Sequence, residues 1–313
     1  MQGLKESFSV VVPVKREANL LRDSLPACYR LNPDEIVVCF DKPAPKECLQ
    51  VVDKTSSKHP EIRTKILEVE RNPEYRFHQA WVRRQGFRET KNNRVLTADV
   101  DLIVNANVLK AIELVGRNDI GLVSCSKLPS VSGLLGFWRT TGDQLVRWFI
   151  QIPHFTGLYC IWKPYWLDSE DERIKELENP RNALGAYVFV GEDTFLLNCM
   201  RRKHRVIFLP DIGAYCMTPN MEDLSHIQFE SGRFLQTRGR RFHRILIQSV
   251  LTARMEQVQG YLYEKQSRHS IPLVDPISFP YLDVGSQAPA GRTIYEILRD
   301  RIKASLSLRV PRA

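Results

Sequence analysis

The chain has 313 residues, of which 43% are hydrophobic and 26% charged, and this composition matches a globular protein and excludes a disordered or fibrous one. Its formal net charge of +9 predicts an anionic partner, which could be a nucleotide phosphate, an anionic lipid or a nucleic acid. The seven cysteines contain no C-x-x-C pair and mostly stand in apolar runs, so we expect buried free thiols in a reducing compartment. No window approaches the roughly 18 apolar residues of a membrane span, and we therefore expect a cytoplasmic protein.

Apolar runs rich in Val and Ile alternate with stretches of helical periodicity along the N-terminal part of the chain. We predict strands at 8–14, 35–40, 64–69, 94–98, 120–124 and 206–209, and helices at 18–30, 77–89 and 105–115. The strand runs do not alternate polar with apolar residues, so both faces of the sheet should be buried. This order predicts an α/β fold with a doubly wound, mainly parallel sheet, in which ligands bind beyond the carboxyl ends of the strands.

The composition divides the chain into two predicted domains. Residues 1–224 would form the ligand-binding and catalytic domain, and residues 225–313 a basic helical C-terminal extension that contains a Pro-rich connector near 271–291. The last predicted helix, 293–308, places apolar residues on one face and arginines elsewhere. This pattern predicts a peripheral contact with an anionic membrane surface.

Acidic residues follow several of the predicted strands at the edge where ligands bind. Glu17 comes soon after the first strand, Asp41 ends the second, and Asp99 and Asp101 follow the fourth. Residues i and i+2 of an extended strand point the same way, so the last two could address one ligand. A divalent cation shared with phosphate oxygens would make two adjacent negative charges tolerable, and Mg²⁺ or Mn²⁺ has this preference. The alternative, in which one Asp caps the next helix and the other is solvated, stays open on these residues alone.

Four short stretches, in order along the chain, resemble landmarks of family 2 glycosyltransferases with the A-type nucleotide-sugar fold: PVKRE, FDKP, VRRQGFRETKNNRVLTADVD and GEDTFL. The likeness extends roughly from Phe8 to Pro219. It implies inverting transfer of a sugar, of the hexosyltransferase type, from a nucleoside-diphosphate sugar to a hydroxyl of a glycan or lipid-linked acceptor, with Mn²⁺ or Mg²⁺ as cofactor. The Q-x-x-R-W signature of processive synthases is absent, so we expect one sugar per event.

The resemblance also implies roles for single residues. Asp193 matches the catalytic base, and Asp99 and Asp101 match the D-x-D that binds the metal. Arg84 stands where the family usually shows Asn. The residues expected to bind the nucleotide sugar are Pro13, Glu17, Asp41, Arg84, Asp99, Glu192 and Arg233, the last with Arg238, Arg240 and Arg241 closing over the phosphates.

Other interpretations compete with this one. A haloacid-dehalogenase-like phosphatase would use Asp99 as nucleophile, but Ile103 stands where that family has Thr or Val. A non-enzymatic nucleotide- or RNA-binding module suits the positive charge, yet no RNP-like aromatic pattern occurs and clustered acids would repel a phosphate backbone, so no nucleic acid is expected as partner. Glu192 and Asp193 could also simply occupy the first turn of a helix. His78 and the other histidines lack ligand spacing, and we expect them in core or surface positions.

Overall fold

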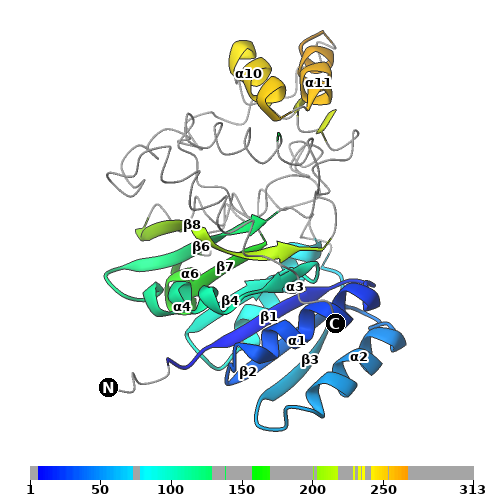
Figure 1. The fold of residues 1–313 in the computed structure, drawn as a ribbon, viewed down its shortest axis with the longest axis vertical. Coiled ribbons are helices and arrows are strands. Elements are labelled where there is room, and N and C mark those ends of the chain that lie inside the picture. The colour runs from blue at the N-terminus through cyan, green and yellow to red at the C-terminus, as the bar shows by residue number, and fades with distance from the viewer. Residues whose placement is uncertain are drawn as a thin grey trace.

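A computed structural model of the chain describes residues 6–72, 78–128, 138, 157–169, 200, 203–217, 228–229, 232–233, 235–236, 241–252 and 254–266. Its centre is an eight-stranded sheet with the order β3-β2-β1-β4-β7-β6-β8-β5 (Figure 1). The strands are β1 Ser9–Val14, β2 Glu35–Asp41, β3 Arg63–Val69, β4 Arg94–Ala98, β5 Leu102–Val104, β6 Ile120–Leu128, β7 Leu158–Trp162 and β8 Arg205–Cys216. The helices are α1 Ala18–Arg30, α2 Lys46–Ser56, α3 His78–Glu89, the 3₁₀ helix η1 Ala106–Val108, α4 Leu109–Leu114, α6 Lys163–Ser169, α10 Phe242–Thr252 and α11 Met255–Gln266.

The sheet is mixed, as the α/β prediction allows. Strands β3, β2, β1 and β4 are parallel to one another, whereas β7 is antiparallel to both β4 and β6. Strand β8 pairs parallel with β6, and the short β5 pairs antiparallel with β8. The carboxyl ends of β1, β2 and β4 therefore meet at one edge of the sheet, which is where such folds bind ligands.

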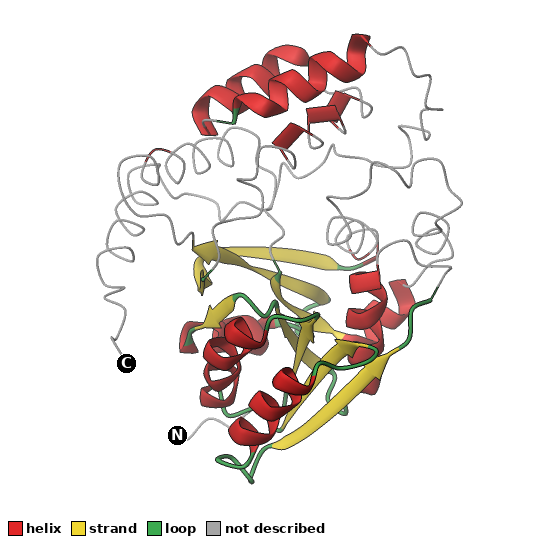
Figure 2. Cartoon of the chain, turned by 90° about the vertical axis from the view of Figure 1, so that its right-hand side faces the viewer, coloured by secondary structure: helices red, strands yellow, loops and turns green. Residues whose placement is uncertain are grey.

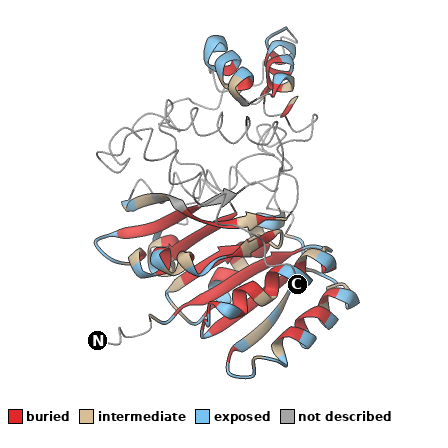
Figure 3. Cartoon of the chain, in the orientation of Figure 1, coloured by how far each residue is buried: buried red, intermediate tan, exposed pale blue. Residues whose placement is uncertain are grey.

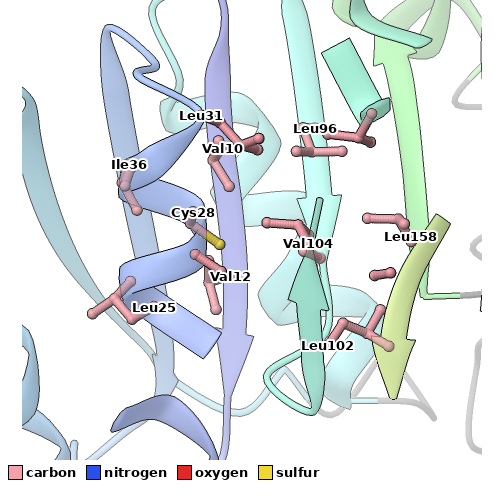
Figure 4. Close-up of a cluster of buried hydrophobic side chains, with 14 of the residues drawn as sticks. Val10, Val12, Leu25, Cys28, Leu31, Ile36, Leu96, Leu102, Val104 and Leu158 are labelled. Atoms are coloured by element: carbon pink, nitrogen blue, oxygen red, sulfur yellow. The ribbon is translucent and has the colours of Figure 1, made fainter. Parts of the chain in front are cut away.

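Helices cover both faces of the parallel half of the sheet, which explains the apolar runs without alternation. On one face, Val10 and Val12 of β1 pack with Leu25 and Cys28 of α1 (Figure 4). On the other face, Val11 packs in a second cluster that includes residues of α3. Figure 3 shows the resulting continuous burial along these strands. Because successive residues of a strand point to opposite faces, both sets must be apolar.

Helix α3 lies unusually close to the strands, and Gly86 permits this. A Cβ atom at Gly86 would be 2.6 Å from Val11 Cγ1 and 2.7 Å from Cys39 Sγ, which is too close for any larger residue without a shift. The close packing fixes α3 against β1 and β2. The helix thereby holds its N-terminal half near the carboxyl edge of the sheet.

The described cysteines are free thiols and buried, as predicted; they are Cys28, Cys39, Cys48, Cys125, Cys160 and Cys216. Burial in the apolar core raises the pKa of Cys28, Cys39 and Cys125 to about 12. These thiols are accordingly packing residues, not nucleophiles.

The sequence prediction placed most elements of residues 6–128 within one or two residues, but it missed several. Helix α1 has the predicted bounds, and the predicted helix at 105–115 is divided into η1 and α4. The prediction contained no β5, β7 or α2. Helices α10 and α11 lie side by side in the C-terminal extension (Figure 2). The division at residue 224 stays a prediction, and the predicted helix at 293–308 lies outside the described residues.

Among the described helices, none has the length and apolar character needed to cross a bilayer.

Candidate active site

The D-x-D sequence forms a tight turn at the carboxyl end of β4. Strand β4 ends at Ala98, and the N–H of Leu102 donates to the carbonyl oxygen of Asp99 at 3.0 Å, which closes a β-turn over Asp99, Val100 and Asp101. The expectation that both carboxylates project from an extended strand is therefore wrong. The two side chains enter different surroundings.

Asp99 forms an ion pair with a buried arginine that the sequence analysis did not assign. Arg83 Nη2 of α3 lies 2.7 Å from Asp99 Oδ1, and the side chains are 3% and 24% exposed. A charge-assisted bond of this length is among the stronger hydrogen bonds in proteins. Arg83 directly precedes Arg84 in the VRRQG stretch, so the motif from which Arg84 was predicted also contained Arg83. The arginine neutralises the first aspartate of the turn.

Gly157 completes the surroundings of Asp99. Its carbonyl oxygen accepts the backbone N–H of Asp99 at 3.0 Å. A Cβ atom at Gly157 would lie 1.6 Å from Asp99 Oδ2 and 2.2 Å from Cγ, so only glycine fits beside this carboxylate. Nothing in the local sequence around Gly157 predicted the contact, because the two residues meet only when β7 pairs with β4.

Asp101 contacts strand β8 instead of α3. Its carbonyl oxygen accepts the N–H of Met217 at 2.8 Å, and the Cys216 thiol donates to its carboxylate oxygen Oδ2 at 3.3 Å. Register pairs Leu102 of β5 with Cys216 of β8, which holds these residues together. Asp101 is thus the carboxylate of the D-x-D that lies apart from the Arg83 ion pair.

Asp41, at the end of β2, is the third acid at this edge. Its Oδ1 lies 3.2 Å from His78 Nε2, with side-chain exposures of 33% for Asp41 and 17% for His78. The other ring nitrogen, Nδ1, is buried and has no hydrogen-bond partner in the described structure. His78 was expected in a core or surface position, whereas the structure places it against Asp41, one of the residues predicted to bind the nucleotide.

Glu17 organises the loop between β1 and α1. The Glu17 carboxylate accepts the backbone N–H groups of Lys15 and Arg16 at 3.0 and 2.8 Å, and its own carbonyl oxygen accepts the N–H of Leu21 in the first turn of α1. Pro13 is buried in β1, opposite Cys39 in register. Both residues shape the loop between β1 and α1. Their contact with a nucleotide stays a prediction.

The remaining predicted ligands lie in other settings. Arg84 is buried in α3, with 5% exposure. Arg233 donates through Nε to Glu264 of α11 at 2.8 Å and lies over the ring of Tyr263. Both of these partners belong to α11. Glu192, Asp193, Arg238 and Arg240 lie outside the described residues, and their roles stay predictions.

The donor atoms at this edge fit a cation that is shared with a ligand, not one enclosed by protein. Within the described ranges, no three His, Cys, Asp or Glu side chains cluster so that they could enclose a metal ion by themselves. A magnesium- or manganese-like ion can be bound by one or two carboxylates and complete its shell with phosphate oxygens and water. Asp101 has the chemistry for this role, and Asp99 is already paired with Arg83.

Comparison with known proteins identifies the family of the chain. Residues 9–163 match the model of the family described as Glycosyl transferase family 2. The chain therefore belongs to glycosyltransferase family 2, and it is an enzyme that takes its sugar from a nucleotide sugar. This assignment replaces the phosphatase and the non-enzymatic binding module as interpretations.

Solved structures with a similar fold were also found. The chain is 15% identical to S. aureus TarS 1–349, with 88% of this chain and 77% of that chain covered and a TM-score of 0.47. The complex of TarS 1–349 with UDP gives 14% identity, coverages of 84% and 91%, and a TM-score of 0.48. The chain is 13% identical to glucosyl-3-phosphoglycerate synthase from Mycobacterium tuberculosis in complex with Mn²⁺, UDP and glucosyl-3-phosphoglycerate. That comparison covers 74% of this chain and 78% of that chain, with a TM-score of 0.46. No protein with a curated function matches the sequence.

Proposed function

We propose that the chain is an inverting, metal-dependent hexosyltransferase that moves one sugar per event from a nucleoside-diphosphate sugar to a hydroxyl of a glycan or lipid-linked acceptor. The observation that supports this best is the unequal setting of the two D-x-D carboxylates. Arg83 neutralises Asp99 at 2.7 Å, while Asp101 lies on the β8 side of the turn. Asp99 and Asp101 can therefore bind two different parts of one nucleotide-sugar donor.

Asp101 is the residue that we assign to the divalent cation, Mn²⁺ or Mg²⁺. When bound, such an ion supplies positive charge to the leaving diphosphate. Asp99 has given one oxygen to Arg83 and is 24% exposed, so it is suited to accept a hydroxyl group of the ribose or sugar. Asp99 had been predicted to bind the metal and the nucleotide sugar. We now assign it to a hydroxyl group of the donor only.

The nucleoside end of the donor is assigned to β2. Asp41 can accept an N–H or O–H group of the base or ribose, and His78 orients its carboxylate through the 3.2 Å contact. Glu17 and Pro13 shape the adjacent loop between β1 and α1. Arg233 would have to leave Glu264 to reach a phosphate, so we assign it to the packing of the C-terminal helices.

Asp193 is proposed as the general base. A hydroxyl is a poor nucleophile until its proton is removed in the transition state, and a positioned carboxylate can take that proton. The acceptor oxygen then bonds to the anomeric carbon from the face opposite the diphosphate. The bond from that carbon to the phosphate oxygen breaks, and the nucleoside diphosphate leaves with the bonding electrons.

Helix α10 supports the proposed contact with an anionic membrane surface. Ile247 and Val250 are 56% and 52% exposed, Arg244 is exposed in the first turn of the same helix, and the exposed Arg241 directly precedes it. Exposed apolar residues beside arginines suit a lipid interface. Co-sedimentation should be stronger with anionic than with neutral vesicles. Equal recovery with both would exclude this part of the proposal.

The donor assignment is tested by thermal shift with a panel of nucleoside diphosphates and diphospho-sugars, each with Mn²⁺ and with chelator. One nucleotide class should raise the melting temperature only when metal is present. The variant Asp193→Asn should keep this stabilisation and lose release of nucleoside diphosphate from the donor sugar. If no compound stabilises the chain with metal, the proposed donor is wrong. If Asp193→Asn retains turnover, the base is another residue.

A further inference from the structure

A thiol stands beside the carboxylate that we assign to the metal. Cys216, the last residue of β8, is 1% exposed and has its Sγ 3.3 Å from Asp101 Oδ2. The backbone fixes this approach from two sides. Leu102 pairs with Cys216 in the β5–β8 ladder, and the Met217 N–H donates to the Asp101 carbonyl oxygen at 2.8 Å. The sulfur is therefore held against the turn by sheet register.

The separation of the two atoms can be compared with what a shared cation requires. Typical bonds are about 2.1 Å from a metal such as zinc to a carboxylate oxygen and about 2.3 Å to a cysteine sulfur. For bond angles between roughly 90° and 110°, these lengths place oxygen and sulfur about 3.1 to 3.6 Å apart. The observed 3.3 Å lies within this interval. A cation could bind both atoms without a change in their spacing.

We infer that Cys216, as a thiolate whose proton is released to solvent when the metal binds, is a sulfur ligand of the divalent cation bound by Asp101, so that the protein part of this metal centre is a mixed oxygen and sulfur pair. This inference rests on the proposed function, in which the diphosphate and water fill the other positions. It deepens that function by predicting metal choice. Mg²⁺ prefers oxygen ligands only, whereas cobalt and zinc accept thiolate readily, so the centre should discriminate against Mg²⁺. A simple thiol to carboxylate hydrogen bond would not produce that discrimination.

Cobalt provides the test, because coordination of Co²⁺ by a thiolate produces a charge-transfer absorption in the near ultraviolet that oxygen ligands do not. The full chain is titrated with Co²⁺ in the presence of the nucleoside diphosphate that stabilises it. The variants are Cys216→Ser, which keeps a polar group of similar size, and Cys48→Ala, which removes a buried thiol of α2. Melting temperatures without ligand establish that each variant is folded.

The expected result is an absorption band in the wild type and in Cys48→Ala that is lost in Cys216→Ser. Affinity for Co²⁺ should fall at least about 10-fold in Cys216→Ser, since even residues that only orient metal ligands have effects of this size. Affinity for Mg²⁺ should change less. The inference is overturned if Co²⁺ binds the wild type without the band, or if Cys216→Ser keeps it. Those outcomes would leave the proposed function intact, whereas absence of any nucleotide-dependent metal binding would remove the proposed function itself.

Discussion

Gly157→Ala should separate Asp99 from Arg83. A Cβ atom at this position would lie 1.6 Å from Asp99 Oδ2, whereas ordinary contact begins near 3.4 Å, so the oxygen has to move by about 1.8 Å (3.4 minus 1.6). The carboxylate is short and its backbone N–H is bound to the carbonyl oxygen of Gly157, so the side chain has to rotate away. A rotation of this size breaks the 2.7 Å bond to Arg83.

The decrease in the free energy of unfolding follows from the loss of the ion pair between Asp99 and Arg83. Loss of one partner of a fully buried ion pair costs about 3 to 5 kcal/mol. Asp99 is 24% exposed and can turn towards water, so we expect about 2 to 3 kcal/mol, chiefly from the buried guanidinium. For a chain of 313 residues, this corresponds to a melting temperature lowered by roughly 3 to 5 °C. Affinity for the donor nucleotide should fall as well, because Asp99 no longer faces it.

A double-mutant cycle isolates the contact. Free energies of unfolding are measured by urea denaturation for wild type, Gly157→Ala, Asp99→Ala and the double variant. In the Asp99→Ala background the added methyl group meets no carboxylate, so Gly157→Ala should cost little and the coupling should be about 2 kcal/mol. Asp99→Asn keeps the shape of the side chain and should keep the clash. If Gly157→Ala destabilises the wild type and Asp99→Ala equally, the reasoning is refuted.

Three further changes have definite expected outcomes. His78→Gln should raise the KM for the donor by roughly 3- to 10-fold with little change in kcat, because it weakens the orientation of Asp41, and an unchanged KM would remove His78 from the site. Gly86→Ala should lower the free energy of unfolding by about 1 to 3 kcal/mol through its clash with Val11, measured by urea denaturation, and a stable variant would show that α3 can move away. Cys28, Cys39 and Cys125 should resist a thiol reagent at pH 8 in the native protein, as read by mass spectrometry of their peptides. Stability should fall as the pH rises above about 9, because the folded state keeps these buried thiols protonated while the unfolded state releases the protons. Fast labelling of these three residues without unfolding would contradict their burial.

Much of the nucleotide-binding half of the fold could be predicted from sequence because its signals are local. Unbroken apolar runs indicated β1, β2 and β4, and each run is followed by an acid at the edge where parallel strands end. Helical periodicity indicated α1 with its observed bounds. The family resemblance then gave the chemistry of these acids.

The elements and contacts that could not be predicted from the sequence depend on contacts between segments that are distant in the chain. Strand β5 has three residues, too few for a periodic pattern, and β7 resembles any short core segment until it pairs with β4. The turn at Asp99 depends on a hydrogen bond from Leu102, which a period of two does not reveal. Cys216 and Asp101 are 115 positions apart in the chain and meet only through the β5–β8 ladder. Sequence patterns therefore located the acids but not their partners.

The central claim, that Asp101 binds a divalent cation together with a nucleoside diphosphate, is tested most directly by the electron paramagnetic resonance signal of free Mn²⁺. Titration of wild type and Asp101→Asn, each with and without the stabilising nucleotide, measures bound manganese without need of an acceptor. Nucleotide should tighten Mn²⁺ binding to the wild type by at least about 10-fold, and Asp101→Asn should lose most of this effect. Equal, nucleotide-independent binding by both proteins would contradict the claim.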